Sequence, residues 1–226
     1  MSPGTVLAQL RGGLIVSVQA NENSVLNTPD AIALLARCCT ANGALGIRAE
    51  GSARLAAVRA AVDRPVIGLI KRRYPGFEPY ITATLDDVKL VIATGAEIVA
   101  FDATRRERPD NSTAASLVSE IHAAGRLAMA DCSTADDALA AASGGADIVG
   151  TTLAGYTEQT RGRALPALDI VKALAHLPFV VCEGGVGSPD QVAAAFAAGA
   201  HAVVVGTALT NLDENVKRFA AASPAR

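Results

Sequence analysis

Hydrophobic residues in this chain form short continuous runs, and longer stretches with a helix-like spacing of apolar positions separate them. Continuous rather than alternating runs are typical of parallel strands that are covered on both faces. The runs predict strands at about 12–19, 44–50, 65–71, 98–103, 126–132, 148–152, 179–184 and 202–208. The stretches between them predict helices at about 29–42, 52–62, 84–95, 112–124, 134–144, 166–175 and 188–199.

Capping residues and glycines mark the ends of the expected helices. Thr28-Pro29 and Ser188-Pro189 are typical helix starts, and Gly199 follows a helical run, as a C-terminal αL residue should. A phrase also recurs, as ANGALGI, ATGAEIV, SGGADIV and AAGAHAVVV. Each copy contains a helix end, a glycine turn and the start of the next run, so the repeating unit is one strand and one helix.

Eight such units in 226 residues predict an α/β fold, a (β/α)8 TIM barrel, with one domain over residues 1–226. A doubly wound open sheet is the alternative. The count of eight disfavours it, as does the lack of a Gly-x-Gly-x-x-Gly fingerprint after the first strand. The tail after Leu212, with an alanine-rich part at 214–222, predicts a final helix that packs on the barrel or on a partner.

Composition narrows the class of protein. Half of the residues are hydrophobic and the formal net charge is −2, which gives no reason to expect nucleic acid or an anionic membrane as partner. No apolar stretch approaches the ~20 residues that cross a bilayer, and the N-terminus lacks a signal-peptide pattern. We therefore expect a soluble, cytoplasmic protein. The four cysteines show neither a CxxC pair nor zinc spacing, so we expect buried free thiols and no metal site.

Several apolar runs end abruptly on a polar or charged side chain. These residues are Gln19, Arg48, Lys71, Asp131 and Glu183. A charge in such a place is costly to desolvate unless it is paired or used, and in a barrel the carboxyl ends of the strands meet at one mouth. Alternation along the strands puts Lys71 on the face of Leu69 and Ile67, and Glu183 on the face of Val181. We therefore expect one constructed site above the barrel interior.

The loops after the seventh and eighth strands have a different character. CEGGVGSPDQ and VVVGTALTN place glycines and small hydroxyl residues where the chain turns toward the next helix. Backbone amides in such loops can hold a phosphate, and many barrels bind phosphate after these two strands. For either loop alone a simple tight turn is an equal alternative, but the two together favour phosphate.

Other polar residues point less clearly to function. Asp102, in Phe-Asp-Ala-Thr, either contacts substrate or braces a loop by capping amides. The basic run that follows it is more typical of a solvated loop. This run contains Arg105, Arg106 and Arg108. The histidines fall in helices or at a strand start, away from the expected mouth, which argues against histidine catalysis or a metal site. They are His122, His176 and His201.

A family resemblance covers nearly the whole chain. The segments that carry it, in order, are GLIVSVQ, GIRAEG, IKRRYPGFEPYITATLDDV, IVAFDATRRERP, LAMADCST, VGTTLAGYT, CEGGVGSPDQ and AVVVGTALT. Together they resemble the bacterial N-acetylmannosamine-6-phosphate 2-epimerases (N-acylglucosamine-6-phosphate 2-epimerases). The resemblance implies a TIM barrel of the phosphate-binding (ribulose-phosphate-binding) type. It also implies interconversion of N-acetylmannosamine 6-phosphate and its glucosamine epimer in sialic acid catabolism, without redox cofactor or metal.

The same resemblance assigns expected roles. It implies that Lys71 is the central acid/base residue and Glu183 its partner, and leaves open which of them removes the C2 proton and which returns it. The expected substrate-binding residues are Gln19, Arg48, Asp131 and Tyr156. The expected phosphate-binding residues are Gly184, Gly185, Gly206 and Thr207. A homodimer packed through the C-terminal helices is also implied.

The chain departs from the family pattern near the expected phosphate site. Gly185 stands where the family usually carries a larger polar or basic residue, and an arginine is common near the position of Asn211. Two outcomes are open: the loss of these charges weakens phosphate binding, or Arg163 or another basic side chain substitutes for them. Two other activities remain open: a lyase or isomerase that uses Lys71 as a Schiff-base nucleophile, and a barrel that binds sugar phosphate without catalysis.

Overall fold

Eight parallel strands form a closed barrel in the computed structural model, which describes residues 2–224. The strands are β1 Gly13–Ser17, β2 Gly46–Glu50, β3 Val66–Leu69, β4 Ile98–Asp102, β5 Leu127–Asp131, β6 Ile148–Gly150, β7 Val180–Cys182 and β8 Ala202–Val205. Each strand pairs with its neighbour in the sequence, and β8 pairs with β1, so the sheet has no free edge. The predicted TIM barrel is confirmed, because an open sheet would lack the last of these pairings.

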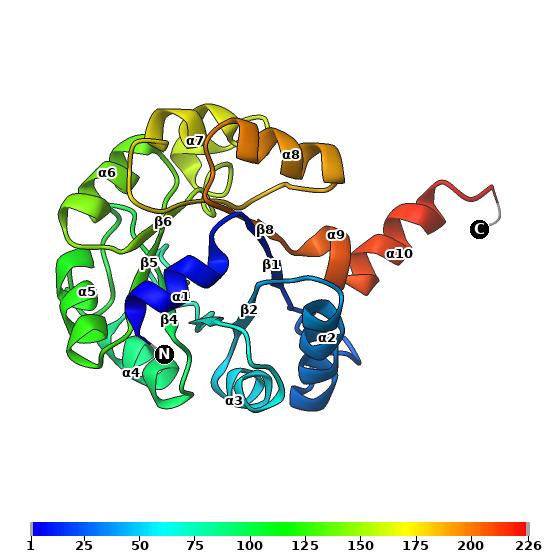
Figure 1. Ribbon diagram of the computed structural model, residues 1–226, viewed down its shortest axis with the longest axis horizontal. Coiled ribbons are helices and arrows are strands. Elements are labelled where there is room, and N and C mark those ends of the chain that lie inside the picture. Colours follow the sequence, from blue (N-terminus) through cyan, green and yellow to red (C-terminus); the bar gives the residue numbers. More distant parts are fainter. Residues whose placement is uncertain (1, 225–226) are drawn as a thin grey trace.

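Helices form a ring around the barrel (Figure 1). They are α1 Pro3–Leu10, α2 Pro29–Ala41, α3 Ser52–Ala61, α4 Leu85–Ala93, α5 Ala114–Ala123, α6 Ala135–Ser143, α7 Leu168–Leu174, α8 Pro189–Ala197, α9 Thr207–Thr210 and α10 Leu212–Ala221, with a short 3₁₀ turn η1 at Glu158–Thr160. The helices predicted between the strands are all present, whereas α1, η1 and α9 were not predicted. The last predicted strand is too long, since β8 ends at Val205 and α9 begins at Thr207.

Side-chain caps explain where helices begin. The hydroxyl of Thr28 accepts a hydrogen bond from the amide of Ala31 (3.2 Å), and that of Ser188 accepts one from Gln191 (3.3 Å). A proline occupies the first turn behind each cap, where its missing N–H is not needed. The capping signals in the sequence are therefore confirmed at both helices.

The apolar core has an inner and an outer part. The inner part fills the barrel and includes Ile67, Leu69 and Val181, as the alternation along β3 and β7 predicted. The outer part lies between the strands and the ring of helices. Val6 and Leu10 of α1 belong to the inner part, and α1 lies across the amino-terminal end of the barrel (Figure 1). This end is therefore closed, and the mouth at the carboxyl ends remains.

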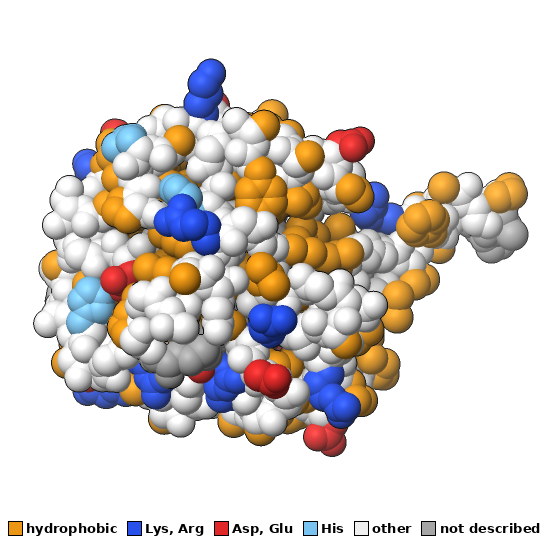
Figure 2. Space-filling view, viewed as in Figure 1, with side chains coloured by type: hydrophobic (Ala, Val, Ile, Leu, Met, Phe, Trp, Pro, Cys, Tyr) orange, Lys and Arg blue, Asp and Glu red, His pale blue; other side chains and the backbone are white. Residues whose placement is uncertain are grey.

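Helix α10 projects away from the ring (Figure 1), and none of its residues is buried. Its anchors are polar: Asn215 donates to the carbonyl of Thr207 (2.9 Å), and Glu214 accepts a hydrogen bond from Asn21 (2.8 Å). Figure 2 shows hydrophobic side chains exposed along this projecting segment. The expected final helix is present; polar contacts hold its first turns on the barrel, its apolar side chains stay uncovered, and packing on a partner stays a prediction.

Two further expectations from composition can be compared with the fold. Among residues 2–224, no helix combines the length and apolar character that crossing a membrane requires. All four cysteines are free thiols, as expected. Cys132 and Cys182 are buried, Cys39 is half-buried and Cys38 is exposed on α2, so the expectation of burial is wrong for Cys38.

Candidate active site

A cavity of about 520 Å³ opens at the carboxyl ends of the strands. This volume suits a small organic ligand. Nine of the ten residues expected to form the site line the cavity. They are Gln19, Arg48, Lys71, Tyr156, Glu183, Gly184, Gly185, Gly206 and Thr207. The tenth, Asp131, is fully buried directly behind Arg48. Residues from distant parts of the sequence are therefore brought into one constellation.

Arg48 is the centre of this constellation. It lies within β2 and is only 1% exposed, and its two terminal nitrogens donate to the two carboxylate oxygens of Asp131, at 3.1 and 2.6 Å. Its Nε lies 3.2 Å from Oε1 of Glu183. Burial acts to lower the pKa of Arg48, but the carboxylates of Asp131 and Glu183 raise it overall. A permanent positive charge therefore lies at the floor of the cavity, between two carboxyl groups.

Glu183 follows β7 directly and is 12% exposed. Burial, followed by the negative charge of Asp131, raises its pKa to about 7, although Arg48, Thr152 and Lys71 act in the opposite direction. A carboxyl group with a pKa near neutrality is available both as acid and as base at physiological pH. Glu183 can therefore take up a proton and give one back in the same catalytic cycle.

Lys71 lies two residues beyond β3, where the chain has left the barrel. Its backbone forms an antiparallel bridge with Ile81, and its ammonium donates a hydrogen bond to the side-chain oxygen of Gln19. Gln19 is fixed in turn by donating to the hydroxyl of Ser17 at 2.6 Å. The side chain of Lys71 therefore reaches the mouth in a defined orientation.

The pKa of Lys71 is lowered. Desolvation by the surrounding protein is the main cause and the positive charge of Arg48 assists it, whereas Glu50, Glu183 and Asp131 favour the charged form. Its neutral amine, the form that accepts a proton, is therefore easier to reach than in a solvated lysine.

The two glycine loops bring backbone close to the cavity. Gly184 and Gly185 have positive φ angles, of 103° and 72°. A Cβ at Gly185 would lie 2.4 Å from the Cβ of Leu165, and one at Gly206 would lie 3.3 Å from the Cβ of Ser17. Residue 185 therefore has no room for a side chain in this backbone.

Comparison with known proteins agrees with this arrangement. The profile of the NanE family, described as "Putative N-acetylmannosamine-6-phosphate epimerase", matches residues 32–224. The chain belongs to this family. A relative from Enterobacter sp. (strain 638), named "Putative N-acetylmannosamine-6-phosphate 2-epimerase", is 44% identical over 225 residues, which cover 96% of this chain and 95% of the relative. A relative of the same name from Synechococcus elongatus is 43% identical, with 97% of each chain covered.

Solved structures agree with the family assignment. The N-acetylmannosamine-6-phosphate 2-epimerase from Clostridium perfringens superposes on this NanE chain with a TM-score of 0.92, at 36% identity and with 95% of each chain covered. The thiamine phosphate pyrophosphorylase from Pyrococcus furiosus, with a TM-score of 0.58 and 15% identity, shares the fold alone.

The basic side chains near the expected phosphate site are not arranged as the sequence suggested. Arg163 donates to both carboxylate oxygens of Asp169, at 2.7 and 2.6 Å, and does not line the cavity. The expectation that Arg163 replaces a missing phosphate contact is therefore wrong. Asn211 does line the cavity, and its side chain caps α10 by accepting from the amide of Glu214 at 3.1 Å. Arg218 of α10 also lines the cavity.

Sequence analysis missed Thr152, Tyr80 and Arg218, all of which line the cavity. The hydroxyl of Thr152 lies 2.7 Å from Asp131 and 3.3 Å from Glu183, so its single proton can serve only one of these carboxyl groups at a time. The available signal was its position at the end of the sixth predicted strand, two residues beyond the observed β6. Hydroxyl residues are too common in loops for that position to single it out.

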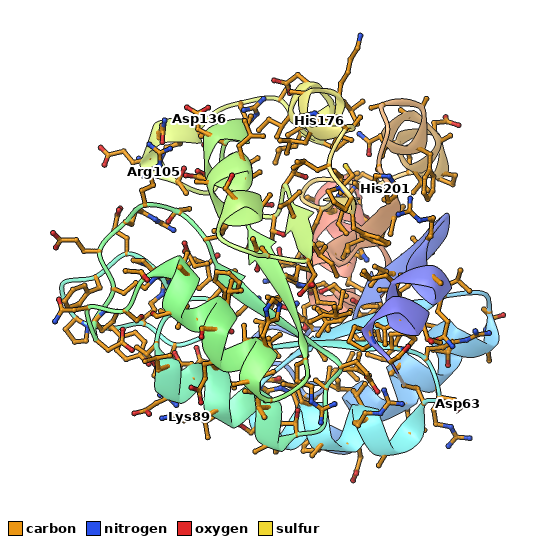
Figure 3. All side chains as sticks on the ribbon, turned by 60° about the vertical axis from the view of Figure 1, so that its left-hand side comes forward. Asp63, Lys89, Arg105, Asp136, His176 and His201 are labelled. Carbon is orange, nitrogen blue, oxygen red and sulfur yellow. The ribbon has the colours of Figure 1, made fainter. Side chains whose placement is uncertain are left out.

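Asp102 and the basic run form a brace. Asp102 accepts hydrogen bonds from the amide and hydroxyl of Thr104, and Arg106 donates to its other oxygen at 2.7 Å. Arg108 is buried and donates to the carbonyl of Asp102. Of the two readings of Asp102, loop bracing is the one observed, and the expected solvated loop is wrong for Arg106 and Arg108. Arg105 is exposed beside a second cavity, as is Asp136 (Figure 3).

The histidines lie away from the mouth, as predicted. His122 contacts Asp147 at 2.8 Å, and the ring Nδ1 of His201 accepts from the amide of Val180 at 2.9 Å. Figure 3 shows His176 beside α7, and His201 lies just before β8, near α1. None of the three lines the cavity.

A pH dependence of stability follows from Glu183. Its folded pKa of about 7 lies above the ordinary value of 4.5, so the folded chain holds this proton more tightly than the unfolded chain does. The resulting stabilisation is fully present below about pH 4.5 and is lost as the pH rises through about 7. We expect the free energy of unfolding to lose about 2 kcal/mol from this group between pH 5 and pH 8.

Urea unfolding of the wild type and Glu183→Gln at both pH values isolates this effect, because other titrating groups contribute equally to the two proteins. The stability of the wild type relative to the variant should fall on going from pH 5 to pH 8. A difference that stays constant with pH would show that Glu183 titrates alike in the folded and unfolded chain.

Proposed function

We propose that this chain interconverts N-acetylmannosamine 6-phosphate and N-acetylglucosamine 6-phosphate, with Lys71 and Glu183 transferring the proton at C2. The observation that carries the proposal is that an amine with a lowered pKa and a carboxyl group with a pKa of about 7 line one cavity of a NanE family barrel. The same proposal assigns the reaction to sialic acid catabolism in the cytoplasm, since a charged phosphate ester does not cross a bilayer unaided.

The chemistry needs two proton-transferring groups. In the open-chain sugar, C2 lies beside the C1 aldehyde, so a base can remove the C2 proton while the electron pair moves into a C1–C2 double bond and leaves negative charge on O1. Return of a proton to the opposite face of C2 restores the aldehyde with inverted configuration. Lys71 and Glu183 follow different strands, β3 and β7, and each serves one face. Their roles exchange when the reaction runs in reverse.

The remaining residues stabilise and orient. Arg48 supplies a fixed positive charge at the cavity floor for the enolate oxygen, and its bidentate pair with Asp131 holds it there. Gln19 orients Lys71 through its hydrogen bond to the amine, and Tyr156 borders the sugar at the cavity rim. The electron pair stays within the substrate throughout, so this scheme needs neither a redox cofactor nor a metal.

The phosphate would bind to the glycine loops after β7 and β8. Gly184, Gly185, Gly206 and Thr207 line the same cavity as the two proton-transferring groups. At the three glycines no side chain would stand between a bound phosphate and the backbone amides.

Proton NMR of N-acetylmannosamine 6-phosphate with the folded enzyme in D2O tests the proposal. We expect the glucosamine epimer to appear with deuterium at C2, because the incoming hydron comes from a group in exchange with solvent. Epimer without deuterium would favour internal transfer of the original proton. No epimer at all would overturn the proposed activity, and borohydride trapping of an imine at Lys71 would then favour the Schiff-base alternative.

We also propose that the chain is a homodimer joined through α10. Leu212, Val216 and Phe219 recur at helical spacing and are 57, 56 and 80% exposed. An apolar stripe of this kind is normally covered by a partner. Multi-angle light scattering should give a dimer for the wild type and a monomer for Val216→Ser combined with Phe219→Ser. A monomeric wild type would overturn this part of the proposal, provided that cutting the chain after Thr210 changes neither its association state nor its stability.

A further inference from the structure

Among the described residues that line the cavity, one cationic side chain is not paired with any other side chain. Among residues 2–224, three such side chains line it: Arg48, Lys71 and Arg218. Arg48 is engaged by two carboxyl groups and Lys71 donates to Gln19. Within the same residues, Arg218 makes neither an ion pair nor a hydrogen bond, and its side chain is exposed. It is therefore free to bind a ligand.

The docking of α10 places Arg218 near the glycine loop after β8. Positions 211, 215 and 218 are three and four residues apart, so they share one side of the helix. Asn211 lines the cavity, and Asn215 donates to the carbonyl of Thr207. This side of α10 therefore faces α9 and the loop that contains Gly206. Figure 2 shows basic side chains close to the point where α10 leaves the body of the molecule.

A phosphate monoester in this part of the cavity needs such a cation. It carries a charge of about −1.5 to −2 at neutral pH, whereas the glycine loops offer only backbone amides. Leu165 excludes a basic side chain at position 185, and Arg163 is held by Asp169. A guanidinium matches phosphate oxygens with two parallel hydrogen bonds.

We propose that Arg218, carried on the C-terminal helix, binds the 6-phosphate of the substrate. This inference rests on the proposed function, because it assigns the phosphate end of the same site. Arg218 contributes to substrate binding and takes no part in the proton transfer. It therefore stabilises the bound substrate and the transition state equally. Its loss should therefore raise KM and leave kcat nearly unchanged.

Steady-state kinetics of Arg218→Ala, Arg218→Lys and Lys217→Ala test the inference. We expect KM for N-acetylmannosamine 6-phosphate to rise about ten- to hundredfold in Arg218→Ala, the range for a lost charge-assisted hydrogen-bonded pair, and by less in Arg218→Lys. Lys217→Ala is the matched control: it is the neighbouring cation on the same helix and does not line the cavity. Equal KM values in Arg218→Ala and Lys217→Ala would overturn the inference.

Binding of inorganic phosphate separates this inference from the proposed function. Calorimetry with the folded proteins needs no turnover, and Kd should rise in Arg218→Ala by about the same factor as KM. Unchanged phosphate affinity would overturn the role of Arg218 even if the wild type is an active epimerase. A weakened affinity would support it even if the wild type gave no epimer. Light scattering of each variant checks that the substitution has not altered the association state.

Discussion

Replacing Lys71 by alanine should abolish epimerisation, with kcat lowered by about 10²–10⁴-fold, the usual contribution of a positioned general acid or base. Glu183→Gln should have an effect of the same order, because the amide keeps the shape of the side chain but cannot exchange a proton. Inversion at C2 needs a group on each face of the carbon. Loss of either one therefore stops the overall reaction even though the other remains in place.

Isotope exchange makes this expectation sharper. A variant that retains one base can still exchange the C2 hydron of the epimer that presents it to that base. In D2O, Lys71→Ala should thus label only one of the two epimers without interconverting them, and Glu183→Gln should label only the other. Epimerisation at the wild-type rate in either variant would remove that residue from the mechanism. Lys172→Ala, on the exposed side of α7, is the control and should behave as wild type.

Replacing Arg48 should have the largest effect on stability. Arg48→Met removes the cation that contacts both Asp131 and Glu183, which leaves two neighbouring carboxyl groups in the buried floor of the cavity. Removal of one member of a buried ion pair typically costs about 3–5 kcal/mol of unfolding free energy. The loss should be greatest at pH 8 and smaller at pH 5, where Glu183 is protonated and no longer needs a positive partner.

Urea unfolding at the two pH values measures this effect. The matched control is Arg163→Ala. The partner of Arg163, Asp169, is 73% exposed, so loss of this ion pair should cost about 0–1 kcal/mol of unfolding free energy. Adding Asp131→Asn to Arg48→Met should recover part of the lost stability, since it removes the uncompensated charge. A loss for Arg48→Met no larger than that of Arg163→Ala would show that the buried cluster contributes little to stability.

The barrel could be predicted from the sequence because its signals are local. Continuous apolar runs, capped helix starts such as Ser188 and glycine turns such as Gly199 each act within a few residues of the chain. Side-chain alternation along the apolar runs likewise predicted Lys71 and Glu183 at the same mouth, although both lie just beyond the ends of β3 and β7.

The contacts that sequence reasoning missed depend on distant parts of the chain. Thr152 reaches both Asp131 and Glu183 only because β5, β6 and β7 are neighbours in the barrel. Arg108 is buried because its loop folds back onto Asp102. Arg218 lies on α10, and a few polar contacts with distant residues set the direction of this helix. The pattern of apolar positions along α10 therefore could not predict that Arg218 lies beside the cavity.

Helix α1 closes the amino-terminal end of the barrel, and this limits the routes by which ligands can enter and leave the site. In the part of the chain that the structure describes, the apolar cluster that includes Val6 and Leu10 fills that end, and the cavity opens at the carboxyl ends of the strands. Substrate and product should therefore enter and leave by this opening, and they compete for the same cavity. Each epimer should consequently inhibit conversion of the other in a purely competitive manner. Flux through this step would then follow the ratio of the two pools more closely than the size of either one.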